Sequence, residues 1–178
     1  MKKLFIITIT VCMLFLVTAC STKNNNQGGN GLPINNTEKK DVPKQNIQYL
    51  TCNKDYSAQM SNGVSMDQDV EIRFVDNKVD TMVMSMNFEL PSAYASAYDT
   101  FVNSMKTTYD NQYGKYNGVT ITVEKESSTE FSIVITMDFS KMTDTDKKAV
   151  GMSGSEDYTV NKTAFINQGY TCKEGVTY

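Results

Sequence analysis

The strongest constraint on the fold is a regular alternation of apolar and polar residues in the first half of the chain. In residues 66–74, every second side chain is apolar, except that Gln68 takes one of these positions, and the side chains between them are charged. A second alternating segment, residues 79–90, follows the turn sequence Asp76-Asn77-Lys78. Strict alternation is typical of a strand with one buried and one solvated face. The two segments therefore predict neighbouring antiparallel strands with one wet face.

A helix is predicted directly after these strands. Pro91 ends the second strand and suits a first helical turn. Apolar side chains then recur every three or four residues up to a helix end near Gly114, which predicts an amphipathic helix of about five turns. We expect this stripe to pack on the methionine-rich face of the sheet. Its members are Tyr94, Tyr98, Phe101, Met105 and Tyr109.

The remaining segments complete an α+β pattern. Residues 47–60 precede the Asn62-Gly63 turn and predict a first strand, while residues 119–123 and 131–139 predict two later ones. Residues 159–168 predict a last helix, followed by Gly169. The order β-β-β-α-β-β-α predicts an α+β domain over residues 49–178. We expect an antiparallel sheet of about five strands, with the long amphipathic helix on one face and a short C-terminal helix.

The N-terminal residues predict an export signal. Lys2 and Lys3 precede a thirteen-residue apolar run, residues 4–16, which is shorter than the ~20 residues that span a bilayer. Val17-Thr18-Ala19-Cys20 then resembles a bacterial lipobox. This predicts removal of residues 1–19 as a lipoprotein signal peptide and diacylation of Cys20. The alternative is an ordinary secretory signal with an incidental cysteine.

The segment after the lipobox, residues 20–48, is predicted to be a disordered, lipid-anchored tether. It is rich in Asn, Gly and Lys and has almost no apolar periodicity, so it cannot bury enough surface to offset its ordering entropy. We therefore expect the domain at the extracytoplasmic face of the cell membrane. The abundance of Asn, Lys, Ile and Tyr favours a low-GC Gram-positive source.

The composition excludes several chemistries. The chain has no histidine, which excludes histidine-based acid–base and nucleophilic catalysis and histidine zinc sites. Loss of Lys2 and Lys3 with the signal takes the formal net charge from −3 to −5, which argues against nucleic acid and anionic surfaces as partners. Arg73 is the only arginine. We expect no enzyme activity, no catalytic residue, no metal site and no cofactor.

Two cysteines, Cys52 and Cys172, stay unassigned once Cys20 is acylated and Cys12 is removed. Disulfides persist in exported chains, so we predict a structural bridge between them that closes nearly the whole domain. Two free thiols or a redox pair are the alternatives, although their wide spacing is unlike a CxxC motif.

Two clusters have metal-binding interpretations. The thioethers of Met82, Met84 and Met86 suit Cu(I), but alternate residues of a strand also face the core, where methionine fills gaps. The segment of residues 67–71, with its three acidic side chains, resembles part of a calcium loop. However, it lacks the sharp-turn glycine of such a loop, and its acidic side chains alternate along a strand. We predict core methionines and a solvated sheet face.

Tyrosines gather near the predicted long helix. Tyr94, Tyr98 and Tyr109 already belong to the apolar stripe, whereas Tyr113 and Tyr116 fall near the helix end. The last two are candidate ligand-binding residues of an aromatic groove for a glycan or peptide. Core packing is the alternative.

Several short motifs resemble the YehR-like family of small bacterial lipoproteins. They are the Asn62-Gly63 turn, the strand Val70-Glu71-Ile72, the turn Asp76-Asn77-Lys78-Val79 and, above all, the ending of residues 165–173. The resemblance runs from Thr51 to Lys173. It implies a single α+β domain on a lipid anchor, and it assigns no catalytic or binding residue.

These observations lead to two functional hypotheses. The first is a membrane-anchored, non-catalytic binding module at the cell surface that engages an envelope protein, a peptide or a small ligand. The second is a structural or accessory subunit of an envelope complex, without a ligand of its own. A hydrolase of the envelope is a distant third because the catalytic side chains are missing.

Overall fold

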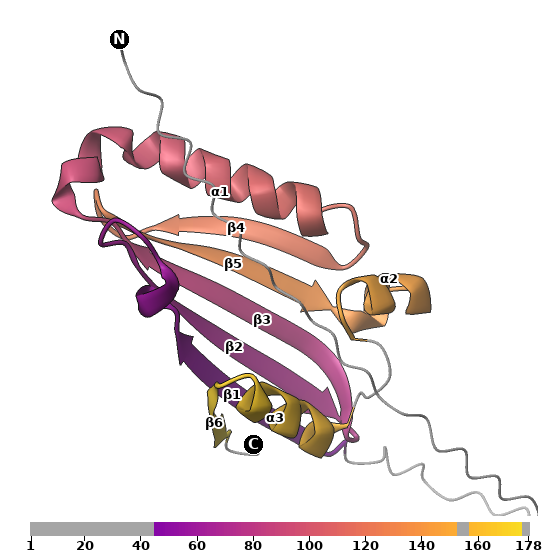
Figure 1. Ribbon diagram of the computed structural model, residues 1–178. Coiled ribbons are helices and arrows are strands. Elements are labelled where there is room, and N and C mark those ends of the chain that lie inside the picture. Colours follow the sequence, from indigo (N-terminus) through magenta and orange to yellow (C-terminus); the bar gives the residue numbers. More distant parts are fainter. Residues whose placement is uncertain (1–44, 153–156, 176–178) are drawn as a thin grey trace, which may run out of the picture.

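The computed structural model describes residues 45–152 and 157–175 and contains, within them, a six-stranded antiparallel sheet. The strand order across the sheet is β4-β5-β3-β2-β1-β6 (Figure 1). The strands are β1 (Ile47–Asp55), β2 (Ser65–Val75), β3 (Lys78–Glu89), β4 (Val119–Lys125), β5 (Glu130–Asp138) and β6 (Thr171–Glu174). The helices are α1 (Tyr98–Tyr113), α2 (Asp144–Ala149) and α3 (Tyr158–Asn167), with 3-10 turns η1 (Ser57–Gln59), η2 (Ser92–Ala97) and η3 (Phe139–Lys141).

The β2–β3 hairpin is the centre of the sheet and forms as the alternation predicts. Asp76 and Asn77 adopt positive φ angles of 50° and 64°, which suit a tight turn between twisted strands. The register pairs Val70 with Met84 and Ile72 with Met82. Their side chains therefore share one face, which is the buried one.

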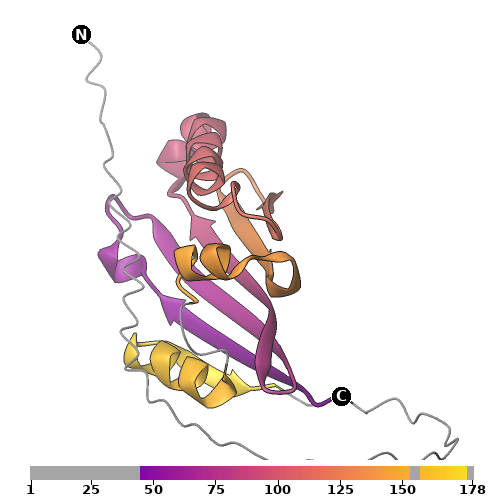
Figure 2. The same ribbon diagram turned by 90° about the vertical axis from the view of Figure 1, so that its right-hand side faces the viewer.

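The core lies between this apolar face and two helices, α1 and α3, which run along opposite edges of the same face of the sheet (Figures 1 and 2). On the β4–β5 side, Tyr98 of α1 contacts Phe131 edge-on. On the β1–β6 side, Tyr158 at the start of α3 contacts Phe74 of β2 in the same way. Both helices thus cover the same face of the sheet.

The predicted α+β architecture is confirmed, with differences at its ends. The sheet gains a sixth strand, β6, after the last predicted helix. The first strand ends at Asp55 instead of residue 60, because the 3-10 turn η1 follows it. A four-residue strand carries too little alternation to be recognised without its partner.

The long helix follows the prediction in part, since Tyr98, Met105 and Tyr109 of the predicted stripe are buried. Residues 92–97 form a 3-10 turn, and the α-helix starts only at Tyr98. A 3-10 turn holds 3.0 residues instead of 3.6, so Tyr94 does not continue the spacing of the α-helical stripe. Val102 and Tyr113 join the core, whereas Tyr94 and Phe101, predicted for the stripe, are only partly buried.

The predicted disulfide is present. The register of β1 and β6 sets Cys52 directly opposite Cys172, and the two sulfur atoms are bonded across 120 positions of sequence. The bridge ties the C-terminal strand, which is an edge of the sheet, to the strand with which the domain begins.

The predicted signal peptide, the acylated Cys20 and most of the predicted tether lie outside the residues that the structure describes. The tether prediction was wrong at its C-terminal end, because Ile47 and Gln48 pair with β2 as the first residues of β1. Among residues 45–152 and 157–175, none of the helices has the length and apolar character that crossing a membrane requires.

Candidate functional site

The face of the sheet opposite to α1 and α3 is the most extensive candidate surface, and we call it the open face. It consists of the odd-numbered residues 51–55 of β1, 65–73 of β2, 81–89 of β3 and 171–173 of β6, with the even-numbered residues of β4 and β5. Thr51, Glu71, Thr122 and Glu124 are exposed on it. The alternation that builds the core therefore also builds a broad polar surface.

A row of hydrogen bonds crosses four strands of the open face. Asn53 on β1 donates to Asp69 on β2 at 2.9 Å. The side-chain amide of Asn87 on β3 donates to Asp67 at 2.9 Å and to Asp69 at 3.0 Å. The hydroxyl of Ser132 on β5, only 4% exposed, lies 2.8 Å from the amide oxygen of Asn87. These side chains are held in place before any partner arrives, which lowers the entropy lost on binding.

Carboxylates outnumber cations on the open face. Its two cations are Arg73, which pairs with Asp80, and the exposed Lys173 at the sheet edge. A hydrogen bond and ion pair from Lys141 hold the pKa of Asp138 below its usual value, and bonds from Ser57 lower the pKa of Asp55. The carboxylates are Asp55, Asp67, Asp69, Glu71, Glu89, Glu124, Glu130 and Asp138.

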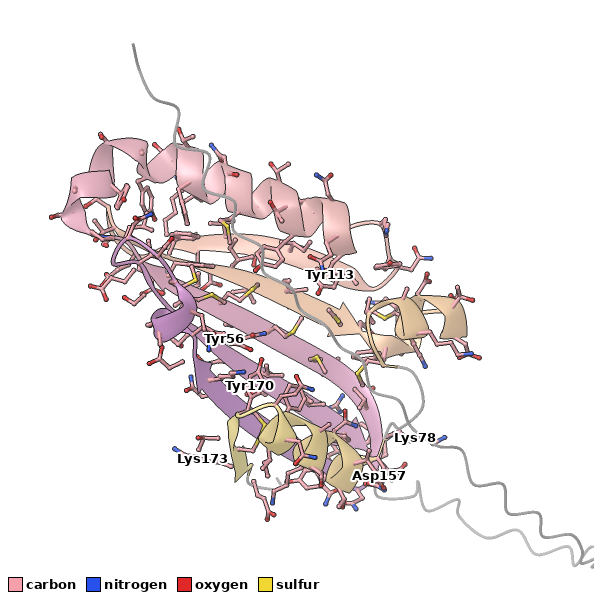
Figure 3. All side chains as sticks on the ribbon, viewed as in Figure 1. Tyr56, Lys78, Tyr113, Asp157, Tyr170 and Lys173 are labelled. Atoms are coloured by element: carbon pink, nitrogen blue, oxygen red, sulfur yellow. A yellow bond between two sulfur atoms is a disulfide. The ribbon has the colours of Figure 1, made fainter. Side chains whose placement is uncertain are left out.

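A second polar cluster lies on the helix-covered face, near α3. The Tyr170 hydroxyl donates to Oε1 of Gln68 at 2.9 Å and lies 3.0 Å from the Tyr56 hydroxyl. Gln68 is fully buried, and its amide nitrogen lies 3.6 Å from the sulfur of Met84. Figure 3 shows Tyr56 and Tyr170 close together on this side of the sheet. Burial raises the pKa of Tyr170, so its hydroxyl stays protonated and donates.

This cluster has a structural explanation. A buried glutamine is costly unless its polar atoms have partners, and Tyr170 supplies one from the segment between α3 and β6. Lys54 donates to the backbone oxygen of Gln168 at 2.7 Å and lies over the Tyr56 ring. The cluster thus locks the C-terminal segment onto the sheet.

The two candidate ligand-binding tyrosines differ in how deeply they are buried. Tyr113 is 5% exposed and stacks on Tyr109 beneath α1, with ring centroids 6.4 Å apart. Desolvation raises the pKa of its hydroxyl. Tyr116 is partly buried against the core, with Lys115 over its ring. A ligand role for Tyr113 and Tyr116 stays a prediction.

The two clusters with metal-binding interpretations occupy the places that ordinary strand packing predicts. Met82, Met84 and Met86 are buried in the core. Residues 67–71 alternate between the core and the open face. Within residues 45–152 and 157–175, no three side chains of the Cys, His, Asp and Glu types are grouped to hold a metal ion.

The sequence reading missed the members of the open face on β3 and β5. Asn87 and Ser132 are 45 positions apart and meet only through the β3–β5 register. The available signal was weak: both occupy polar positions between core residues in strands that alternate. Period-two spacing identifies such residues as outward-facing but does not say which of them become neighbours.

The fold and its surfaces define the class of the protein as a one-sided α+β domain, with helices on one sheet face and an open polar face on the other. No protein-family model matches the chain, and no curated protein matches it. The solved structures that it resembles include a Streptococcus pneumoniae TIGR4 protein determined by NMR. The two sequences are 12% identical, the match covers 87% of this chain and 99% of that chain, and the TM-score is 0.46.

The chain is also similar in structure to Escherichia coli YehR, determined by NMR. The TM-score is 0.50 at 12% identity, with 72% of this chain and 91% of YehR covered. At this identity the likeness shows a shared fold.

Proposed function

We propose that this chain is an extracytoplasmic lipoprotein of the YehR-like family that works as a non-catalytic binding module. A diacylglyceryl group on Cys20 would hold it at the cell membrane, and two acyl chains suffice for stable anchoring. In this proposal residues 21–46 serve as the tether, and a flexible coil of that length would have a root-mean-square span of roughly 30 Å, enough to hold the domain clear of the headgroups. The proposal rests on the lipobox for its location and on the open face for its activity.

The observation that carries the binding role is the one-sided layering of the domain. The helix-covered face is filled by core side chains, whereas the open face presents polar groups fixed by hydrogen bonds across β1, β2, β3 and β5. Fixed polar groups on a rigid sheet suit recognition of a partner surface. The missing histidine and the single arginine favour binding over catalysis.

Replacement of Cys20 by alanine is expected to abolish lipid attachment. In cells fed an alkyne-labelled fatty acid, the wild-type chain should carry the label and be cleaved after Ala19. Cys20→Ala should lack the label and keep its signal, because the thiol that accepts the diacylglyceryl group is gone. Gel fluorescence and intact mass measure both.

Cys12→Ala is the matched control, since that cysteine lies within the predicted signal. It should be labelled and cleaved like the wild type. Label that persists in Cys20→Ala, or that disappears equally in Cys12→Ala, would refute the anchor.

A further inference from the structure

The open face combines a charged part with an apolar part. Val83 on β3 and Val134 on β5 lie on it as partly exposed side chains on adjacent strands. Threonines surround them, since Thr136 is opposite Val83 and Thr122 is opposite Val134. Glu71 lies beside Val83 on the other flank. Small apolar side chains enclosed by polar ones are the usual anatomy of a protein interface.

The dimensions of the open face suit a polypeptide partner. With strands about 4.8 Å apart, the six strands span about 24 Å, and nine residues of a strand cover about 30 Å. The resulting area of about 700 Å² is close to the ~800 Å² that one partner contributes to a standard interface.

The net negative charge of the open face favours a cationic partner over a second copy of the chain or an anionic surface. A second copy docked face to face would set two surfaces of net negative charge against each other, and like charges in an interface cost binding free energy. Anionic lipid and other polyanions are repelled for the same reason. A cationic partner gains from each of these groups.

Building on the proposed function, we propose that the open face docks a lysine- or arginine-rich polypeptide segment that also carries small apolar side chains. Its cations face the carboxylates of β2 and β4, including Glu71 and Glu124, and its apolar side chains pack on Val83 and Val134. The hydrogen-bonded row through Asp69 and Asn87 holds the recognition surface in place.

The test uses the full mature lipoprotein in neutral detergent micelles. The probe is a fluorescent, soluble peptide in which lysine, serine and valine alternate, and the control peptide has glutamate at each lysine position. Fluorescence anisotropy measures both at about 0.05 M and about 0.3 M sodium chloride, because added salt screens exposed charges. The face variant is Glu71→Gln/Glu124→Gln. The matched control, Asp110→Asn/Asp144→Asn, changes the net charge equally on α1 and α2.

We expect salt-sensitive binding of the lysine peptide alone, and an affinity at least about threefold weaker for the face variant. The control variant should bind like the wild type, and both variants should unfold at the wild-type temperature. The inference is overturned by equal binding of both peptides, by equal losses in both variants, or by no binding. It is also overturned if the face variant abolishes self-association seen by sedimentation. The lipid label on Cys20 is scored separately, so loss of peptide binding with the label intact removes the cationic partner and leaves the anchor standing.

Discussion

Replacing Phe131 by alanine is expected to lower the free energy of unfolding by about 3–5 kcal/mol. Phe131 is 1% exposed at the centre of the contact between α1 and the sheet. Its ring stacks on Phe88 of β3 with centroids 4.9 Å apart, and it receives the edges of Tyr98 and Phe101 at 5.8 Å. Truncation leaves a cavity that these three rings cannot fill together, because their own rotamers are fixed by the helix and the sheet.

Urea titration followed by circular dichroism measures the loss, with Phe101→Ala as the comparison. Phe101 contacts the rings of Phe88 and Phe131 but is only partly buried, so its truncation admits water and should cost clearly less. Equal losses for the two variants, or a larger loss for Phe101→Ala, would contradict the partial burial of Phe101 and favour its full burial, as predicted from the sequence.

Removal of the Cys52–Cys172 bridge should lower the free energy of unfolding by about 2–4 kcal/mol. The bond closes a loop over a sequence separation of 120 residues, for which the chain-entropy model gives about 5 kcal/mol. The loss acts mainly through the unfolded chain, which regains freedom without its crosslink. The folded domain should keep its helix-covered core, since Tyr170 still bonds Gln68 and packs on Phe165.

Urea titrations of the wild type and of Cys52→Ala/Cys172→Ala, each with and without a reducing agent, measure this effect. The reducing agent should bring the wild type to the midpoint of the double variant and leave the double variant unchanged. Alkylation of the free thiols shows whether the reducing agent has opened the bridge. If it has and the urea midpoint of the wild type does not change, the expected stabilisation is contradicted.

The parts of the fold predicted from the sequence are those that local periodicity determines. The faces of β2, β3 and β5 follow from alternation because the side-chain period of a strand is two wherever the strand pairs. The buried stripe of α1 was predicted correctly at Tyr98, Met105 and Tyr109. It was wrong at Tyr94, which lies in the 3-10 turn of residues 92–97, and at Phe101, beside which Val102 takes the buried position.

The candidate surface was less predictable because it depends on contacts between distant residues. Asn87 and Ser132 are 45 positions apart and meet only once β3 and β5 are paired. Strand order and register are properties of the assembled sheet, set by how the faces pack and by turns. The acidic residues 67–71 were correctly predicted as a solvated face, but their neighbours on β3 and β5 were not.

The most direct test of the central claim, that the open face is the binding surface of a membrane-anchored module, is site-specific photocrosslinking in the native envelope. A photoreactive phenylalanine replaces exposed residues on the open face, Thr51 and Thr122, or exposed residues on the helices, Thr107 and Thr163. Mass spectrometry then identifies each adduct. We expect the same partner protein from both open-face positions, and no such adduct from the two helix positions. Adducts that form from Thr107 and Thr163 while both sheet positions stay uncrosslinked would contradict the account.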